Sequence, residues 1–145
     1  MARGGFDYEA FKRLADRLLS LEDGELDSFV RSQTAEMGNR FLGQVKKLTP
    51  VRTGNLRNKW SVSEVATDNK GPYVTVYNSE EKYASCVEYG HKQQPGLYVP
   101  ELGKRLVKSW VSGRFMMTNT KMQMEVQMPK IVQRNMEKFI RDHLR

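Results

Sequence analysis

Cysteine and histidine are scarce in this sequence. One cysteine, Cys86, and two histidines, His91 and His143, occur among 145 residues. A single cysteine excludes an intrachain disulfide and a zinc site built from several cysteines. Two histidines would need several carboxylates beside them to hold a metal ion, and the sequence contains no such cluster. We therefore expect neither a metal ion nor a cofactor.

Long apolar runs are lacking as well. No stretch approaches the roughly 18 apolar residues that a membrane span needs. Residues 1–8 lack the apolar core and the cleavage site of a secretion signal. Hydrophobic residues make up 39% of the chain and mean hydropathy is −0.66, which is low for a globular protein. These features favour a soluble cytoplasmic protein that has part of its length in extended arms or exposed helices.

Positive charge exceeds negative charge, with 24 lysines and arginines against 17 aspartates and glutamates, for a net charge of +7. This balance permits contact with nucleic acid or with an acidic protein surface and requires neither. Near the C-terminus, five cations at helical spacing fall within about 80° of each other. We call them the basic stripe: Lys130, Arg134, Lys138, Arg141 and Arg145. The stripe is a DNA- or partner-facing surface or, as is commoner for such helices, a solvated face.

The length of the chain suits one domain with one core, and apolar periodicity predicts its helices. Helical spacing holds over residues 6–21 and again over 25–48, where Pro50 ends the longer helix. A last helix is predicted over 118–145. Pro129 inside it predicts either a kink or a later start.

The middle of the chain has the pattern of paired strands. Residues 56–65 and 73–78 alternate apolar and polar side chains, as strands do. A hairpin loop over 66–72 would join them as an antiparallel pair.

The segments that follow give weaker signals. Residues 80–88 fit a helix or a strand equally well, glycines and prolines predict a loop over 90–100, and residues 106–115 fit a short extended segment. Together the elements predict an α+β fold. In it, a small antiparallel sheet is flanked by a long N-terminal helix and a C-terminal helix.

Two short constellations have residues that can carry chemistry. Residues 53–57, Thr-Gly-Asn-Leu-Arg, lack the glycine spacing and the Lys-Ser/Thr pair of a P-loop, which favours a tight turn from helix to strand. Cys86, Glu88 and His91 lie within six residues of each other. A Cys-His nucleophile pair would need a third, orienting group, and a buried structural cysteine is the commoner case.

Aromatic and methionine side chains indicate packing. Trp60, Trp110 and Tyr73 are most simply core or interface aromatics. Five of the eight methionines lie between Met116 and Met128. Methionine fills adaptable apolar contacts, so this cluster predicts contacts between subunits.

Two stretches are similar to a known family. Residues 49–57 read Thr-Pro-Val-Arg-Thr-Gly-Asn-Leu-Arg, and residues 83–91 read Tyr-Ala-Ser-Cys-Val-Glu-Tyr-Gly-His. They resemble the gene-product-ten-like neck and tail-component family of long-tailed double-stranded-DNA phages. Members show a Pro-x-x-Thr-Gly-x-Leu-Arg turn after a long helix and, after a hairpin, a Tyr-Ala-x-x-Val-Glu-Tyr-Gly-Thr/His stretch. The positions that match are Pro50, Thr53, Gly54, Leu56, Arg57, Tyr83, Glu88, Tyr89 and Gly90.

The resemblance spans roughly residues 25–145 and includes residues 113–117, Gly-Arg-Phe-Met-Met. His91 departs from it, because threonine is commoner at that position. The resemblance implies a tail-terminator-like fold and a single neck or tail-component domain over 1–145. Within this domain, residues 1–24 would form an N-terminal helical arm and residues 90–117 a long loop or extended arm.

The function that the resemblance implies is structural. Such a protein forms a virion ring, six-fold in symmetry, at the head–tail junction, where it surrounds the DNA channel and joins the head connector to the tail. It has no enzymatic activity. Its partners would be its own copies, neighbouring neck, head-closure and tail proteins, and double-stranded DNA passing through the lumen. It would be found in the virion neck or tail, after assembly in the host cytoplasm.

Two alternatives remain at this point. One is a free nucleic-acid-binding protein that uses the basic stripe. The other is a small enzyme that depends on Cys86. For the structural reading, we expect residues 80–115 to provide contacts between subunits and between rings.

Overall fold

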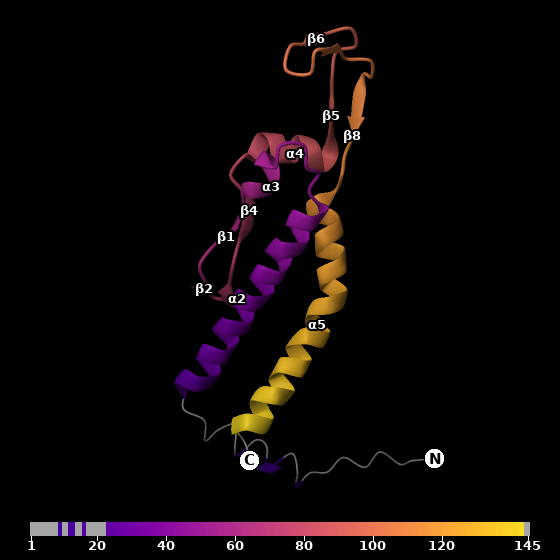
Figure 1. Ribbon diagram of the computed structural model, residues 1–145. Helices are drawn as coiled ribbons and strands as arrows, with labels where there is room; N and C mark the ends of the chain where they lie inside the picture. The colour runs from indigo at the N-terminus through magenta and orange to yellow at the C-terminus, as the bar shows by residue number, and fades with distance from the viewer. Residues whose placement is uncertain (1–8, 10–11, 14–15, 17–22, 144–145) are drawn as a thin grey trace, which may run out of the picture.

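The computed structural model describes residues 9, 12, 13, 16 and 23–143. Two long helices, α2 (Asp23–Leu48) and α5 (Met116–His143), lie antiparallel and side by side (Figure 1). α2 confirms the longer predicted helix and its end before Pro50. The helix predicted over 6–21 lies mostly outside the described residues. Among the described residues, no helix combines the length and the apolar character that crossing a membrane requires.

The C-terminal helix begins earlier than the sequence indicates. α5 starts at Met116 and contains Pro129 in its interior, so the proline does not mark its start. Because proline has no N–H, the carbonyl of Glu125 loses its usual helical partner. Met116 and Met124 are buried in the molecule's own core. For these two methionines, the prediction of subunit contacts was wrong.

A hairpin of short strands follows α2 in the chain and lies between two shorter helices. β1 (Trp60–Val62) pairs antiparallel with β4 (Val76–Asn78), and β2 (Ala66–Asp68) pairs antiparallel with β3 (Gly71–Tyr73). These pairs confirm the predicted antiparallel hairpin and the α+β class. Among the described residues, the strands form separate two-stranded pairs and not one small sheet.

The first predicted strand was wrong at its start. Residues 56–65 begin instead with α3 (Asn55–Asn58), a single helical turn preceded by Gly54, whose φ is +81°. Leu56 on this turn is buried and lies in one apolar cluster with Val45. Burial of this one leucine overrides the strand alternation read from the sequence, because tertiary packing outweighs local preference.

The predicted loop over residues 66–72 was also wrong, because β2 and β3 occupy most of it. The turn itself has only two residues, Asn69 and Lys70. The carboxylate of Asp68 accepts a hydrogen bond from the N–H of Lys70 at 2.8 Å. Such side-chain bonds to the backbone two residues on favour tight turns.

Beyond the hairpin, the chain forms α4 (Glu81–Tyr89), which resolves residues 80–88 as helix. Two further antiparallel pairs follow, and β8 confirms the extended segment expected within 106–115. The pairs are β5 (Gly90–Lys92) with β8 (Trp110–Ser112), and β6 (Tyr98–Val99) with β7 (Lys104–Arg105). Because β5 and β6 lie within residues 90–100, the prediction of a loop was wrong at these strands.

The core lies where the C-terminal end of α2 meets the start of α5. Its buried side chains are those of Val45, Leu56, Trp60, Ala84 and Met116. Thr49 is buried beside them. Its hydroxyl donates a hydrogen bond to the carbonyl of Val45 at 2.6 Å and accepts one from Trp60 Nε1 at 2.9 Å. The indole N–H is therefore satisfied inside the core, as burial requires.

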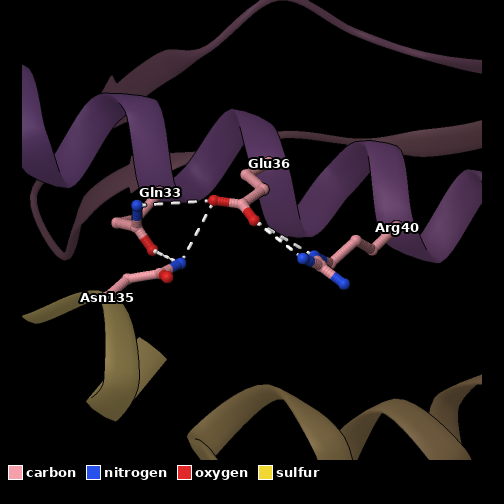
Figure 2. A network of polar contacts seen from close by, with 4 residues as sticks. All are labelled: Gln33, Glu36, Arg40 and Asn135. Carbon is pink, nitrogen blue, oxygen red and sulfur yellow. Dashed lines mark hydrogen bonds and ion pairs between the residues drawn. The ribbon is translucent and has the colours of Figure 1, made fainter. Parts of the chain in front are cut away.

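Farther along, the contacts between α2 and α5 include polar side chains. Asn135 Nδ2 donates hydrogen bonds to Gln33 Oε1 at 2.8 Å and to Glu36 Oε2 at 3.2 Å (Figure 2). Glu36 also pairs with Arg40 at 3.0 Å, one turn along α2. An amide that bonds two side chains on the facing helix favours one register of the pair, because a shift would leave these groups unpaired.

Candidate functional site

The structure brings the two motif stretches together. Leu56 from the first and Ala84 from the second lie in the same buried cluster. Asn78, also buried, donates from Nδ2 to the carbonyl of Leu56 at 3.0 Å and accepts at Oδ1 from the N–H of Glu80 at 2.8 Å. This side chain links α3 to the start of α4. Sequence reasoning did not single it out.

The first stretch forms the turn between α2 and α3. Pro50 is exposed directly after α2, and Gly54 has a positive φ. Thr53 Oγ1 accepts a hydrogen bond from the N–H of Asn55 at 3.3 Å, a hydroxyl-to-backbone bond that is typical of turns. Arg57 is exposed at the end of α3. The segment has the geometry of a tight turn and lacks the glycine-rich cradle of a phosphate loop.

The second stretch caps the N-terminus of α5. The buried carboxylate of Glu88 accepts three hydrogen bonds: from the N–H of Met117 at 2.8 Å, from the N–H of Thr118 at 2.9 Å and from the Thr118 hydroxyl at 2.6 Å. A carboxylate at this position satisfies free N–H groups and complements the helix dipole. Sequence analysis missed this role, because Glu88 meets the start of α5, 29 residues further along the chain, only in the folded structure.

Two glycines lie where the chain leaves α4 and where it returns to begin α5. Gly90 has a φ of +85°, and a Cβ added to it would lie 2.4 Å from the carbonyl oxygen of Val111. A Cβ added to Gly113 would lie 2.4 Å from the carbonyl oxygen of Glu88. A side chain at either position would collide with backbone. The two chain segments can therefore cross at the end of α4 only because both residues are glycine.

Residues 90–115, which we call the arm, project past α4 and away from the two long helices (Figure 1). Backbone hydrogen bonds hold the arm as a hairpin, including those of the β5–β8 and β6–β7 pairs. The guanidinium of Arg105 donates to the carbonyl of Gly96 at 2.9 Å and lies 6.0 Å from the centre of the Tyr98 ring. No residue between 90 and 115 is fully buried.

The surface of the arm is apolar and basic. The exposed apolar side chains are Leu97, Tyr98, Leu102, Val107, Trp110 and Phe115. Five cations accompany one carboxylate, Glu101, giving a formal charge of +4. The cations are Lys92, Lys104, Arg105, Lys108 and Arg114.

A groove of about 240 Å³ runs beside α4. Its apolar walls include Trp60, Ala84 and Met117. Tyr77 and Tyr89 also line it while exposing 48% and 64% of their surface. Tyr83, on the same helix, is 52% exposed. Two of the matched motif positions, Tyr83 and Tyr89, thus present aromatic rings to solvent and do not pack in the core.

The basic stripe lies on the solvent side of α5. Lys130, Arg134, Lys138 and Arg141 are exposed, and Arg145 lies outside the described residues. The opposite side of the helix packs on α2, where Phe139 stacks on Phe29 with ring centroids 4.3 Å apart. Among the residues that the structure describes, the stripe cations form no ion pair within 4 Å. The structure thus places four of the five predicted cations on one free face.

No hydrogen bond joins the side chains of Cys86 and His91. Cys86 is half-buried in α4, and His91 Nδ1 lies 3.1 Å from the carbonyl oxygen of Lys92 in β5. The nearby carboxylate, Glu88, is occupied by α5. Within the described part of the chain, no three His, Cys, Asp or Glu residues are grouped to hold a metal ion.

The three aromatic residues that we predicted to lie in the core or at an interface differ in their burial. Trp60 is a core residue, whereas Trp110 and Tyr73 are 49% and 44% exposed.

A family model described as "Bacteriophage HK97-gp10, putative tail-component" matches residues 12–90 of the chain. The matched range includes α2, the first motif stretch, residues 83–90 of the second and all of α4, and it ends at the first residue of the arm. No curated protein and no solved structure matches the chain. The resemblance read over residues 91–145 stays a prediction.

Proposed function

Because the chain belongs to the HK97-gp10-like family of bacteriophage tail components, we propose that it is a structural virion protein of the head–tail junction. In this role, copies of the chain form a ring around the DNA channel and join the head connector to the tail. The family match is the observation that carries the proposal. The six-fold symmetry, the position at the neck and a tail-terminator-like fold belong to the proposal as well.

The distribution of surface chemistry supports an assembly role. A ring needs two different surfaces on each subunit that fit each other and close. The chain offers an apolar arm at one end of the molecule and an apolar groove beside α4. We assign contacts within and between rings to residues 80–115. Residues 1–24 serve in this proposal as an N-terminal arm.

A deletion of the gene in the phage that encodes it tests the joining role. The proposal predicts that mutant lysates accumulate DNA-filled heads and complete tails that are not joined, visible by negative-stain microscopy. Supplying the chain from a plasmid restores joined particles. Normal joined particles from the deletion mutant would refute the proposal.

The basic stripe supports a second contact, with an acidic neighbour or with the DNA in the lumen. Four exposed cations without ion-pair partners in the described structure are available for either. The triple variant Arg134→Glu, Lys138→Glu and Arg141→Glu reverses this face. We expect fewer joined particles and lower infectivity. A matched control reverses three exposed cations outside the stripe and the arm: Lys47→Glu, Arg52→Glu and Lys70→Glu. Unchanged assembly in the stripe variant would remove the stripe from the proposal.

Free binding to nucleic acid is the competing function for the same stripe. A protein that neutralises four phosphates loses affinity with salt at a log–log slope of about −3.6. The structural role predicts that the purified protein does not shift duplex DNA at physiological salt. A strong shift with that slope, abolished in the triple variant, would favour the competing function. Full function of the Cys86→Ala variant would exclude a cysteine-dependent enzyme.

A further inference from the structure

We propose that the tip of the arm of one copy docks in the groove beside α4 of the next copy. The inference rests on the proposed ring and names the two surfaces that close it. The arm contributes Leu97, Tyr98 and Leu102 together with Lys104 and Arg105. The groove contributes Trp60, Tyr77, Ala84, Tyr89 and Met117, and Glu81 also lines it.

In the described part of the chain, most of the large apolar side chains of the arm stay exposed to solvent. Its strands are two or three residues long and form only two-stranded pairs, an arrangement that is marginally stable alone in water. Leu97 and Tyr98 are 50% and 52% exposed, and Val107 is 86% exposed. An exposed apolar cluster on a projecting hairpin is typical of a contact surface for another protein.

The groove, in turn, is an apolar recess that apolar side chains of another copy can fill. Trp60, Ala84 and Met117 form its walls, and the rings of Tyr77 and Tyr89 extend from its edge into solvent. Side chains that enter it would bury these rings. Partly exposed aromatic residues around a hydrophobic recess are the residues that most often anchor protein interfaces.

Charge complementarity identifies the occupant as the arm. Glu80 and Glu81 are exposed at the start of α4, and neither forms an ion pair among the described residues. Residues 80–89 therefore contain three carboxylates, Glu80, Glu81 and the buried Glu88, and one cation, Lys82. The arm has a charge of +4. Opposite charges around an apolar contact favour this pairing and set its orientation.

The arm that fills the groove comes from another copy. Figure 1 shows the arm extending from the end of α4 away from the rest of the molecule, so its tip points away from its own groove. Because the arm tip and the groove are different surfaces, each copy can insert its arm into one neighbour and accept the arm of another neighbour in its groove. Such a heterologous contact closes into a ring when its rotation permits.

A second groove is a weaker receptor. It has a volume of about 330 Å³ and lies between α2, the 60–78 hairpin and α5, where Met37, Phe41 and Val74 line it. No charged residue lines it. It therefore offers no complement to Lys104 and Arg105.

Disulfide trapping tests the contact in assembled particles. In a Cys86→Ser background, Leu97→Cys is combined with Ser85→Cys, an exposed groove residue on α4. We expect oxidised particles to give a ladder of covalent multimers on a denaturing gel, and reduction to collapse it to monomer. The matched control combines Leu97→Cys with Ser32→Cys, which is exposed near the far end of α2, and should give monomer.

The outcomes separate this contact from the ring itself. Particles that contain the double-cysteine chain but yield only monomer, or a ladder as strong from the control pair, would overturn the arm–groove contact and leave the ring standing. Particles of the unmodified phage that lack the chain would overturn both proposals. A ladder from only the Ser85→Cys pair supports both.

A charge swap provides a second readout. Glu81→Lys should lower the yield of covalent multimers by about two- to fivefold, the range expected for a solvent-exposed pair. Lys104→Glu should lower it similarly. Combining the two substitutions should recover most of the yield. Additive losses in the combined variant would contradict the pairing of the arm with α4.

Discussion

The body of the molecule and its arm use the same kinds of side chain in opposite ways. The body, made of α2, α3, α4, α5 and the 60–78 hairpin, buries Trp60 and bonds its indole N–H to Thr49. The arm leaves Trp110 49% exposed. The body therefore contains the contacts that hold one chain folded, and the arm contains apolar surface that another chain can cover.

The two regions also differ in how their polar groups are fixed. In the body, side chains fix the ends of helices: Glu88 caps α5, and Asn78 bonds both α3 and the start of α4. In the arm, backbone pairing provides most of the hydrogen bonds. We conclude that folding and assembly depend on separate parts of the chain, and the following variants test that separation.

The largest expected difference is between the two tryptophans. Trp60→Ala removes a buried ring and leaves a cavity, which should lower the free energy of unfolding by about 3–5 kcal/mol. Trp110→Ala in the arm should cost less than about 1 kcal/mol in the isolated chain, because half of its surface is already in water. Urea denaturation followed by circular dichroism measures both. Equal losses of unfolding free energy in the two variants would contradict the distinction between body and arm.

The junction between the two regions should be the next most sensitive place. Gly90→Ala puts a Cβ against the Val111 carbonyl oxygen at a positive φ, and should cost about 1–3 kcal/mol. Gly43 in α2 is a matched control, because nothing lies within 4 Å of a Cβ built there. Gly43→Ala should stabilise the helix by about 0.5–1 kcal/mol. Thermal unfolding that shifts the same way for both variants would contradict this account of Gly90.

The cap of α5 should have a smaller effect. Glu88→Gln keeps the shape of the side chain but removes the charge that faces the helix N-terminus, at a cost of about 1–2 kcal/mol. The control is Glu81→Gln, whose carboxylate is exposed and should change stability by less than about 0.5 kcal/mol. Chemical denaturation of the two variants provides the comparison. A neutral Glu88→Gln would show that the cap contributes little.

Shortening the arm should change stability least and assembly most. Lys92 and Trp110 face each other in register, so residues 93–109 can be replaced by Asn-Gly, a two-residue hairpin turn. The free energy of unfolding should stay within about 1 kcal/mol of the parent. The shortened chain should not enter particles. An arm-less chain that still forms normal collars would place the assembly contacts in the body.

The sequence predicts the long elements well. Helical spacing over 25–48 and the stop at Pro50 give α2, because a periodic helix ended by proline is a local signal. The antiparallel pairing of β1 with β4 also follows from local alternation. The motif stretches at 49–57 and 83–91 indicate the family, and the family match covers the first stretch and residues 83–90 of the second.

The remaining features depend on contacts between distant parts of the chain. α3 forms because Leu56 enters a core shared with Ala84 and Met116. α4 is a helix because Ala84 and Glu88, four residues apart, are both buried. The strands of the arm are too short to leave a periodic signal, so their sequence resembles a loop. The role of Glu88 appears only when the start of α5 is beside it.

The most direct test is a cryo-electron-microscopy map of the head–tail junction of the phage that encodes this chain. The account predicts a closed ring of copies at the collar, in which each arm, residues 90–115, lies in the groove beside α4 of the next copy. A map without the chain at the collar, or with a ring whose arms contact no neighbouring copy, would contradict it.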